Sequence, residues 1–374
     1  MRKRSLLKED IDKRRLWPTA LRLTMNEDEI KTVVELFQIE GSLQCFNEIN
    51  SGLINRTYRV IFNLNGSTEK SYIFQKMNSD IFKKPDELME NIAMVTDFIR
   101  PKIRTLSLLK CRGRNYCVVD GNYWRGYEFI DGAELSDRNN LVQICSAGRA
   151  FGELHKALID FDTSKLHLTL PDLHNIRKNY EMMIQSYEED RLKRAGVCQS
   201  EYLFLLSVKD IACSVMNTTL PVRVVHNDTK LSNVIITPNN EAVVIDFDNV
   251  MPGYIWQDYG DAIRSVVNTA SEDEENLENV TCNMDAFYAF SEAYLNQVGP
   301  DLSSAEMQSL AISSFAITCE LAARFLKDYL DGDRYFHTDK DGQNLNRCRV
   351  QIALAQGIWG NVNQMSRFVD EFIM

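Results

Sequence analysis

The sequence predicts an α+β protein with two lobes, a small N-terminal lobe built on an antiparallel sheet and a larger C-terminal lobe that is mostly helical. Residues from about 43 to 130 show strand-like alternation with one helical stretch inserted. Beyond Asp131-Gly132 the apolar residues recur at helical spacing, apart from a small β patch at 222–248. The chain has 374 residues, more than one hydrophobic core usually spans, which also favours about two domains.

We divide the chain into three segments. Residues 1–24 hold eight basic and three acidic residues, against the acidic balance of the whole, and we interpret them as a flexible, solvated extension rather than as a basic interaction arm. An over-long gene start, with Met25 as the true beginning, would leave the same pattern. Residues 25–130 form the N-terminal lobe and 131–374 the C-terminal lobe, and a ligand is expected in the cleft between them.

The N-terminal lobe is expected to begin with a helix at Asn26-Glu27-Asp28-Glu29. Apolar residues then fall on one face from Ile30 to Phe37, and the acids lie in the first turn, where they favour a helix. Two strands follow, at 57–62 and 72–76, joined by the turn-rich Asn65-Gly66-Ser67.

The rest of this lobe is predicted as one helix and one hairpin. The helix runs from about Pro85 to Arg100, because apolar residues repeat along one stripe. The strands at 116–119 and 124–130 are joined by Asp120-Gly121-Asn122, a typical hairpin turn.

Composition excludes several classes of protein. The net charge is −11, which argues against a broad surface for nucleic acid or for an anionic membrane. No apolar run approaches the roughly 20 residues of a membrane helix. Nine cysteines, with no CxxC pair and irregular spacing, suggest neither a disulfide framework nor a zinc site. No apolar signal core follows the basic N-terminus, so we expect a cytoplasmic protein.

The sharpest chemical pattern lies in the β patch. An apolar run leads into His226-Asn227-Asp228-Thr229-Lys230-Leu231-Ser232-Asn233, and after a hairpin a second apolar run ends in Asp246-Phe247-Asp248. Strand and hairpin should bring Asp228, Asn233 and Asp246 to one point. Oxygen donors of this kind suit Mg²⁺, which takes few protein ligands beside substrate phosphates.

Phosphoryl transfer needs such a set of groups. Its transition state spreads charge over phosphate oxygens, so catalysis depends on positioning and on charge neutralisation. Asp228 fits the base that accepts a hydroxyl proton, and Asn233 and Asp246 fit the metal ligands. Lys230 can reach the transferred phosphoryl group as a point charge.

Both motifs resemble the catalytic and metal-binding loops of the protein-kinase-like fold, written H-R-D-x-x-x-x-N and D-F-G. The intervals of five residues from Asp228 to Asn233 and eighteen from Asp228 to Asp246 match that pattern. Asp248 stands in place of the glycine, as is common in the aminoglycoside phosphotransferase and choline kinase branch.

From about residue 30 to 360 the chain resembles the N-acetylhexosamine 1-kinases of that branch. This resemblance implies ATP- and Mg²⁺-dependent phosphorylation of the anomeric 1-hydroxyl of N-acetylglucosamine or N-acetylgalactosamine. Besides the catalytic motif, it is carried by Ile54-Asn55-Arg56-Thr57-Tyr58, Tyr72-Ile73-Phe74-Gln75-Lys76-Met77-Asn78, Met251-Pro252-Gly253, Tyr259-Gly260-Asp261-Ala262-Ile263-Arg264 and the stretch from Arg324 to Phe336.

On the acceptor side the resemblance implies that Asp228 takes the proton of the sugar's 1-hydroxyl and that Arg324 and Tyr335 hold the sugar. From the residues alone, Arg324 lies in an apolar helical stretch where an unpaired charge is costly. A structural salt bridge to Glu320 or Asp328 therefore stays open beside the sugar contact. Leu53 stands where the family has a histidine that touches the sugar, which bears on the preferred substrate.

On the nucleotide side the resemblance implies contacts from Gly52, Asn55 and Thr57, at the turn before the first strand of the hairpin, although this turn has one glycine and lacks a G-x-G-x-x-G pattern. Backbone groups of Glu128 and Ile130 would meet adenine. Where protein kinases keep a lysine, this chain has Gln75 followed by Lys76. Neighbouring strand residues point to opposite faces, so only one of the two can face the phosphates, and we expect Gln75.

Two other functions stay open. The first is a kinase of another small hydroxyl compound, such as an aminoglycoside, homoserine or choline, although Arg324 in the pocket would oppose a cationic acceptor. A catalytically inactive kinase-like binding protein is the other alternative, against which the intact set Asp228, Asn233 and Asp246 argues. The expected partners are ATP, Mg²⁺ and a small-molecule sugar.

Overall fold

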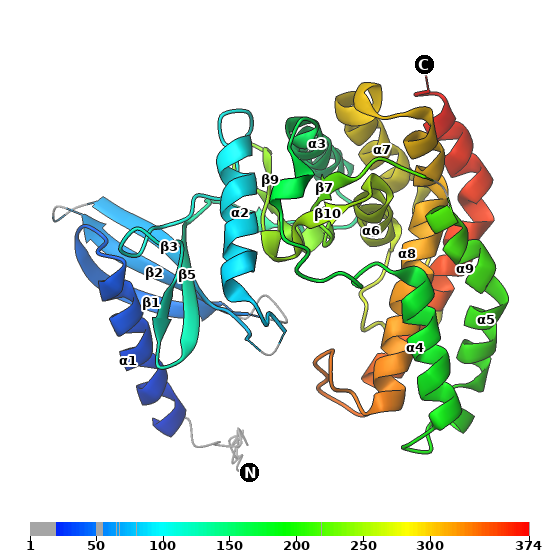
Figure 1. Ribbon diagram of the computed structural model, residues 1–374, viewed down its shortest axis with the longest axis horizontal. Coiled ribbons are helices and arrows are strands. Elements are labelled where there is room, and N and C mark those ends of the chain that lie inside the picture. Colours follow the sequence, from blue (N-terminus) through cyan, green and yellow to red (C-terminus); the bar gives the residue numbers. More distant parts are fainter. Residues whose placement is uncertain are drawn as a thin grey trace, which may run out of the picture.

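The computed structural model describes residues 20–49, 55–64, 66, 68–79, 81–217 and 219–373, with side chains from Asp28 onward. A sheet with one covering helix forms one lobe, and a larger group of helices forms the other (Figure 1). This arrangement confirms the predicted α+β class with two lobes. Residues 1–19 of the predicted extension lie outside the described residues. The last residues of that extension, from Ala20, belong to α1 (Ala20–Leu36), so this helix begins earlier than predicted.

The N-terminal lobe contains a five-stranded antiparallel sheet in the order β1-β2-β3-β5-β4. Its register places Thr57 opposite Gln75, and Gln75 opposite Arg125, so these three side chains are neighbours on one face. The strands are β1 (Ser42–Ile49), β2 (Arg56–Leu64), β3 (Thr68–Lys76), β4 (Cys117–Val119) and β5 (Asn122–Glu128).

The other face of the sheet packs against α1. Ile30 and Val33 of the helix are fully buried together with Val60 and Phe74 of the sheet. Since side chains alternate along a strand, this packing directs Thr57 and its two neighbours away from α1.

The helix α2 (Pro85–Ile99) stands between the sheet and the helical lobe (Figure 1). Proline at its start and acids in its first turn favour the helix, as predicted. Its buried stripe, which includes Leu88 and Ile92, belongs to the large core of the C-terminal lobe.

Helices make up most of the C-terminal lobe, and α8 lies at its centre. This helix begins with a capping box of Ser303 and Glu306 and ends at Gly332, whose φ of 96° glycine adopts readily. The helices are α3 (Leu141–Leu158), α4 (Ile176–Glu189), α5 (Gln199–Cys213), α6 (Ile255–Val267), α7 (Met284–Val298), α8 (Ser304–Asp331) and α9 (Gln343–Asp370).

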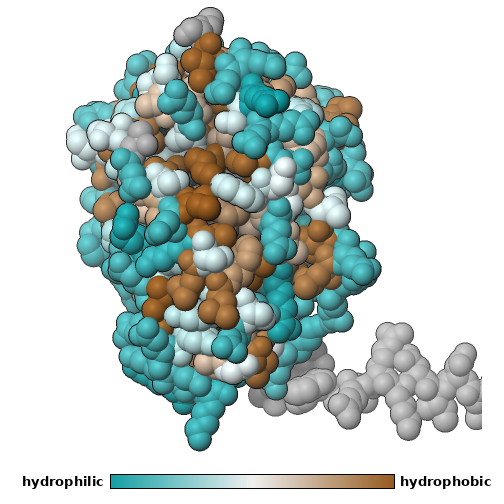
Figure 2. Space-filling model, turned by 90° about the vertical axis from the view of Figure 1, so that its right-hand side faces the viewer, coloured by the Kyte–Doolittle hydropathy of each residue, from teal (hydrophilic) through white to brown (hydrophobic). Residues whose placement is uncertain are grey.

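By length and composition α8 could cross a membrane, but 83% of its most apolar window is buried within the protein. It packs against α4, α5, α6 and α9, as expected of a core helix. On the outer face of the lobe, apolar groups form a broken band down the middle of the view, with polar groups on both sides (Figure 2). Leu203 of α5 and Trp359 of α9 are among the exposed apolar residues of the described chain.

The predicted β patch consists of two small sheets. One has the order β6-β8-β9, and the other pairs β7 with β10. The sequence did not reveal β6 or β10, because strands of two or three residues depend on partners far along the chain, and because β10 contains a proline. The strands are β6 (Ala133–Glu134), β7 (Arg223–Val225), β8 (Val234–Ile236), β9 (Ala242–Val244) and β10 (Met251–Gly253).

Candidate active site

A cleft of about 600 Å³ separates the two lobes. All predicted site residues that the structure describes line it, whereas Gly52 and Leu53 lie outside the described residues. The cleft therefore brings together groups from both lobes. The predicted residues along it are Asn55, Thr57, Gln75, Glu128, Ile130, Asp228, Lys230, Asn233, Asp246, Arg324 and Tyr335.

The loop after β7 carries Asp228, and Asp258 of α6 holds this loop in place. The buried carboxylate of Asp258 accepts the backbone N–H groups of His226 and Asn227, both at 2.6 Å. His155 donates to it as well, at 2.7 Å, so that this histidine packs beneath the loop. Asn227 has a φ of 61°, a conformation that its surroundings must enforce.

Asp228 lies within reach of two donors. Lys230 Nζ and Asn233 Nδ2 both donate to its Oδ2 at 2.9 Å, which leaves Oδ1 for an acceptor hydroxyl. Burial by itself raises the pKa of Asp228, but the charge and the hydrogen bond of Lys230, with smaller contributions from His226 and Asn233, together outweigh burial and hold the pKa below its usual value. Asp228 is therefore ionised at neutral pH, as a base must be.

Asp246 follows β9 in a left-handed conformation, with a φ of 63°. Its loop is tied to the catalytic loop, because His226 Nε2 donates to the carbonyl of Ile245 and the N–H of Ile245 donates to the carbonyl of Asn233, each at 2.9 Å. Burial raises the pKa of Asp246 to about 7, and the carboxylates of Asp248 and Asp228 add to this effect.

This raised pKa indicates a site for a cation. Within the described residues the Asp246 carboxylate has no hydrogen bond or ion pair, and the carboxylates of Asp248 and Asp228 repel its charge more than Lys230 and Arg125 attract it. The carboxylate of Asp246 and the amide oxygen of Asn233 form a small, oxygen-only donor set. Such a set fits Mg²⁺, which is usually held by one or two carboxylates and keeps most of its waters.

At the nucleotide end the structure distinguishes Gln75 from Lys76. Gln75 lines the cleft, whereas Lys76 lies on the opposite face of the sheet and pairs with Glu29 of α1 at 3.1 Å. The Gln75 amide is already engaged, because Arg125 Nε donates to its oxygen at 3.0 Å and its nitrogen donates to Thr57 Oγ1 at 3.1 Å.

The hinge between the lobes follows β5. The N–H of Glu128 donates to the carbonyl of Ser107 at 3.0 Å, and its side chain pairs with Lys70, so this N–H is not free for adenine. The N–H of Ile130 has no backbone acceptor in the described part of the chain. It is the better placed of the two predicted hinge donors.

At the opposite end of the cleft, Arg324 of α8 lies beside two aromatic rings. Its guanidinium carbon is 5.7 Å from the ring centre of Tyr335 and 5.5 Å from that of Phe336. It has no ion pair within the described residues. The two acids considered as structural partners are engaged elsewhere: Glu320 binds other side chains, and Asp328 accepts the backbone N–H groups of residues 334–336.

The carboxylates that line this acceptor end have cationic partners. Asp261 and Glu272 both pair with Arg264 at 2.9 Å. Glu320 pairs with His174 at 3.0 Å. Burial by itself lowers the pKa of His174, but the charge and the hydrogen bond of Glu320, together with the charge of Asp261, more than offset burial, so the pKa is raised. Arg324 is thus a cation at this end of the cleft that has no ion pair within the described residues.

Comparison with known proteins identifies the family. The sequence profile of the phosphotransferase enzyme family matches residues 46–283. The chain belongs to the phosphotransferase enzyme family. It is therefore a small-molecule kinase that transfers a phosphoryl group to a hydroxyl acceptor, and the alternative of an inactive binding protein is set aside.

Solved structures show the same fold at low identity. A microcompartment-associated aminopropanol kinase is 17% identical, with 92% of this chain and 98% of that chain covered and a TM-score of 0.60. An aminoglycoside phosphotransferase from Alicyclobacillus acidocaldarius is 12% identical, with 91% and 96% covered and a TM-score of 0.62. A spectinomycin phosphotransferase, solved with ADP and spectinomycin, is 11% identical, with 88% and 98% covered and a TM-score of 0.60. These phosphotransferases share the fold of this chain.

Sequence reasoning missed three buried residues of this phosphotransferase: Arg125, His174 and Asp258. Each is polar, and each holds a partner that is remote in sequence. Arg125 could have been found from the sequence, because it stands in the apolar run of a predicted strand. A charge in such a stretch is costly without a partner, which is the reasoning that was applied to Arg324. Trp256 is buried and does not line the cleft, which agrees with a packing role.

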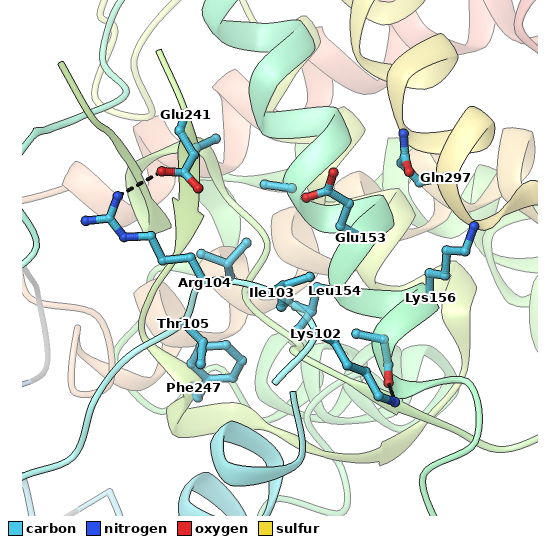
Figure 3. Close-up of a pocket in the computed structure, with 14 residues that line it drawn as sticks. Lys102, Ile103, Arg104, Thr105, Glu153, Leu154, Lys156, Glu241, Phe247 and Gln297 are labelled. Carbon is cyan, nitrogen blue, oxygen red and sulfur yellow. Dashed lines mark hydrogen bonds and ion pairs between the residues drawn. The ribbon is translucent and has the colours of Figure 1, made fainter. Parts of the chain in front are cut away.

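A second hollow, of about 560 Å³, lies outside the cleft between α3, β9 and the segment that follows α2 (Figure 3). Three of the charged side chains that line it are engaged within the protein. Arg104 binds Glu241 at 2.8 Å, and Lys102 donates to the carbonyl of Ala157 at 2.6 Å. None of the predicted site residues lines it, so we assign nucleotide and acceptor to the cleft.

Proposed function

We propose that this phosphotransferase is an ATP- and Mg²⁺-dependent sugar kinase that phosphorylates the anomeric 1-hydroxyl of an N-acetylhexosamine. The observation that carries the proposal is the charge at the acceptor end. The carboxylates of Asp261, Glu272 and Glu320 there are each engaged by Arg264 or His174, and Arg324 is left without an ion pair in the described part of the chain.

This arrangement opposes a cationic acceptor. Amine substrates need a free carboxylate or an open aromatic cage. Here the rings of Tyr335 and Phe336 already face the guanidinium of Arg324, which takes the place an ammonium group would occupy. A guanidinium can instead donate to neutral sugar oxygens, such as a hydroxyl or an acetamide carbonyl. The resemblance to N-acetylhexosamine 1-kinases points to the same acceptor.

The catalytic groups suit this reaction. Asp228 accepts the proton of the acceptor hydroxyl at Oδ1, because its Oδ2 is held by Lys230 and Asn233. Lys230 faces the developing charge of the transferred phosphoryl group. Asp246 and Asn233 would hold Mg²⁺, which neutralises phosphate charge when it is bound. ADP in the solved spectinomycin phosphotransferase supports ATP as the donor here.

The test is ADP release with Mg-ATP over a panel of acceptors. The panel holds N-acetylglucosamine, N-acetylgalactosamine, glucose, galactose, an aminoglycoside, choline and homoserine, with Asp228→Asn as the control. Turnover with an N-acetylhexosamine, lost in the control, and a 1-phosphate product by phosphorus NMR are expected. Turnover with choline or the aminoglycoside, and none with sugars, would refute the charge argument.

The same unpaired guanidinium also suits an acceptor that carries a carboxylate. An Arg–carboxylate pair is among the stronger polar contacts in proteins. Homoserine is the member of the panel with this chemistry, and turnover confined to homoserine would favour this second candidate.

A further inference from the structure

Arg125 of β5 is a buried charge at the boundary of the two lobes. It is 1% exposed, and it lies on the sheet face that is directed toward the cleft. Its Nη1 is 2.5 Å from Oδ1 of Asp248, in the loop that carries Asp246, while its Nε binds Gln75. A buried ion pair therefore joins the N-terminal sheet to the loop that presents the candidate metal ligand.

Further polar contacts extend this pair into a chain of side chains. The other oxygen of Asp248 accepts from Asn55 Nδ2 at 2.7 Å, and Asn55 Oδ1 accepts the N–H of Asn78 at 3.0 Å. On the other side, Gln75 donates to Thr57. We call these five residues, Thr57, Gln75, Arg125, Asp248 and Asn55, the interlobe clamp.

The interlobe clamp changes the interpretation of three predicted nucleotide contacts. Asn55, Thr57 and Gln75 line the cleft, but their amide and hydroxyl groups bind one another or the clamp's ion pair. Their first role is then to support Arg125 and Asp248.

The interlobe clamp also differs from the arrangement in protein kinases. There a lysine on the third strand pairs with a glutamate on the helix that follows, and activity requires this pair. Here the third strand offers Gln75, and the facing helix α2 offers Met89, whose sulfur is 4.0 Å from Arg125 Nη1. The cation comes instead from β5, and its partner lies two residues after Asp246.

We propose that Arg125 is a positioning residue that, by pairing with Asp248, holds Asp246 in the geometry that binds the Mg²⁺–nucleotide complex. Asp246 benefits from such support, because a left-handed backbone costs energy for a residue with a side chain, although aspartate adopts it more readily than most, and surrounding contacts help to hold it. The clamp ties this backbone to a rigid sheet. The inference rests on the proposed use of Mg²⁺.

The test separates positioning from folding. Arg125→Met alone leaves the Asp248 charge buried and unpaired, which can prevent folding. The informative protein is therefore the double variant Arg125→Met with Asp248→Asn, which removes both charges and keeps an amide beside Asn55. The matched control makes the same two changes at an exposed pair, Arg100→Met with Asp97→Asn.

Three measurements are compared for the wild type, the double variant and the control: the melting temperature without ligand, the dissociation constant of ADP by calorimetry with and without Mg²⁺, and kcat. We expect the double variant to bind ADP alone like the wild type but to lose about tenfold or more of the affinity that Mg²⁺ adds. A displaced reacting group costs about 10²-fold in rate, so kcat should fall by that order. The control should keep all three values.

A double variant that retains the Mg²⁺-dependent gain in ADP affinity would show that the clamp is merely structural and would overturn the proposal. If the double variant does not fold, Arg125→Lys decides, because lysine keeps the charge but cannot bind Gln75 and Asp248 in the same fixed geometry. If Mg²⁺ increases the ADP affinity of this variant less than that of the wild type, the proposal is supported. An equal increase overturns it. If Mg²⁺ does not increase the ADP affinity of the wild type, the proposed use of the metal is itself overturned.

Discussion

Asp258 provides the sharpest test of how the catalytic loop is held. Its carboxylate is 1% exposed and faces donors only: the N–H groups of His226 and Asn227 and the ring of His155. In Asp258→Asn only one of the two side-chain atoms that replace the carboxylate oxygens can accept a hydrogen bond. The other atom is the amide nitrogen, which is itself a donor and faces the N–H group that the lost oxygen had accepted. At least one hydrogen bond to a charged acceptor is lost, and one buried N–H is left unpaired.

The expected magnitude follows from these two losses. A hydrogen bond to a charged group contributes about 1.5–3 kcal/mol, and an unpaired buried donor costs about 1–3 kcal/mol, so the free energy of unfolding should fall by about 2.5–6 kcal/mol. With an unfolding entropy of roughly 2.1 cal/mol/K per residue over 374 residues, the melting temperature should fall by about 3–8 °C. Because Asp228 follows Asn227 directly, kcat should fall by about 10²-fold.

Calorimetric melting and ADP release measure both effects, with Asp97→Asn as the control. Asp97 keeps 64% of its side-chain area exposed and pairs with Arg100 on the surface. Exposed pairs contribute about 1 kcal/mol or less, so the control should melt within about 1 °C of the wild type. An Asp258→Asn protein that melts as the control does and keeps its kcat would refute the reasoning.

Three further substitutions in the cleft test its electrostatics. Asp228→Asn should bind ADP normally but lose about 10²–10⁴-fold in turnover, since it removes the base; calorimetry and ADP release check this, and sustained turnover contradicts it. Burial and the charge of Arg324 lower the pKa of His174, but Glu320 and Asp261 raise it by more, so the pKa in the folded protein is above the ordinary value of 6.5. The ion pair of His174 therefore stabilises the fold fully at a pH below 6.5. This stabilisation is lost as the pH rises through the raised pKa. The difference in unfolding free energy between wild type and His174→Gln should therefore shrink from about pH 6 to pH 8 in urea titrations, and a constant difference would contradict it. Arg324→Lys should raise the acceptor KM about tenfold and leave the ATP KM unchanged in initial-rate kinetics, because lysine lacks the planar donor geometry; equal changes in both would argue against a sugar contact.

Several features of the fold could be predicted because they depend on local sequence. The helix α2 followed from its periodicity, and the hairpin of β4 and β5 from its Asp120-Gly121-Asn122 turn. Alternation along β3 was enough to predict that Gln75 and Lys76 face opposite ways. The early start of α1 was missed, because the basic residues before it hide the helical pattern.

The spacing of Asp228, Asn233 and Asp246 determined, by sequence alone, which residues line the floor of the cleft. Strand, turn and strand lie within a few residues of one another there, so short-range order places the groups. The tertiary structure decided what surrounds them. Asp248 binds Arg125, which is 123 positions away, and Asp258 closes over a loop some thirty residues earlier. Such partners come together only when the core of each lobe packs, and a pattern along the chain cannot show which buried charge another charge will meet.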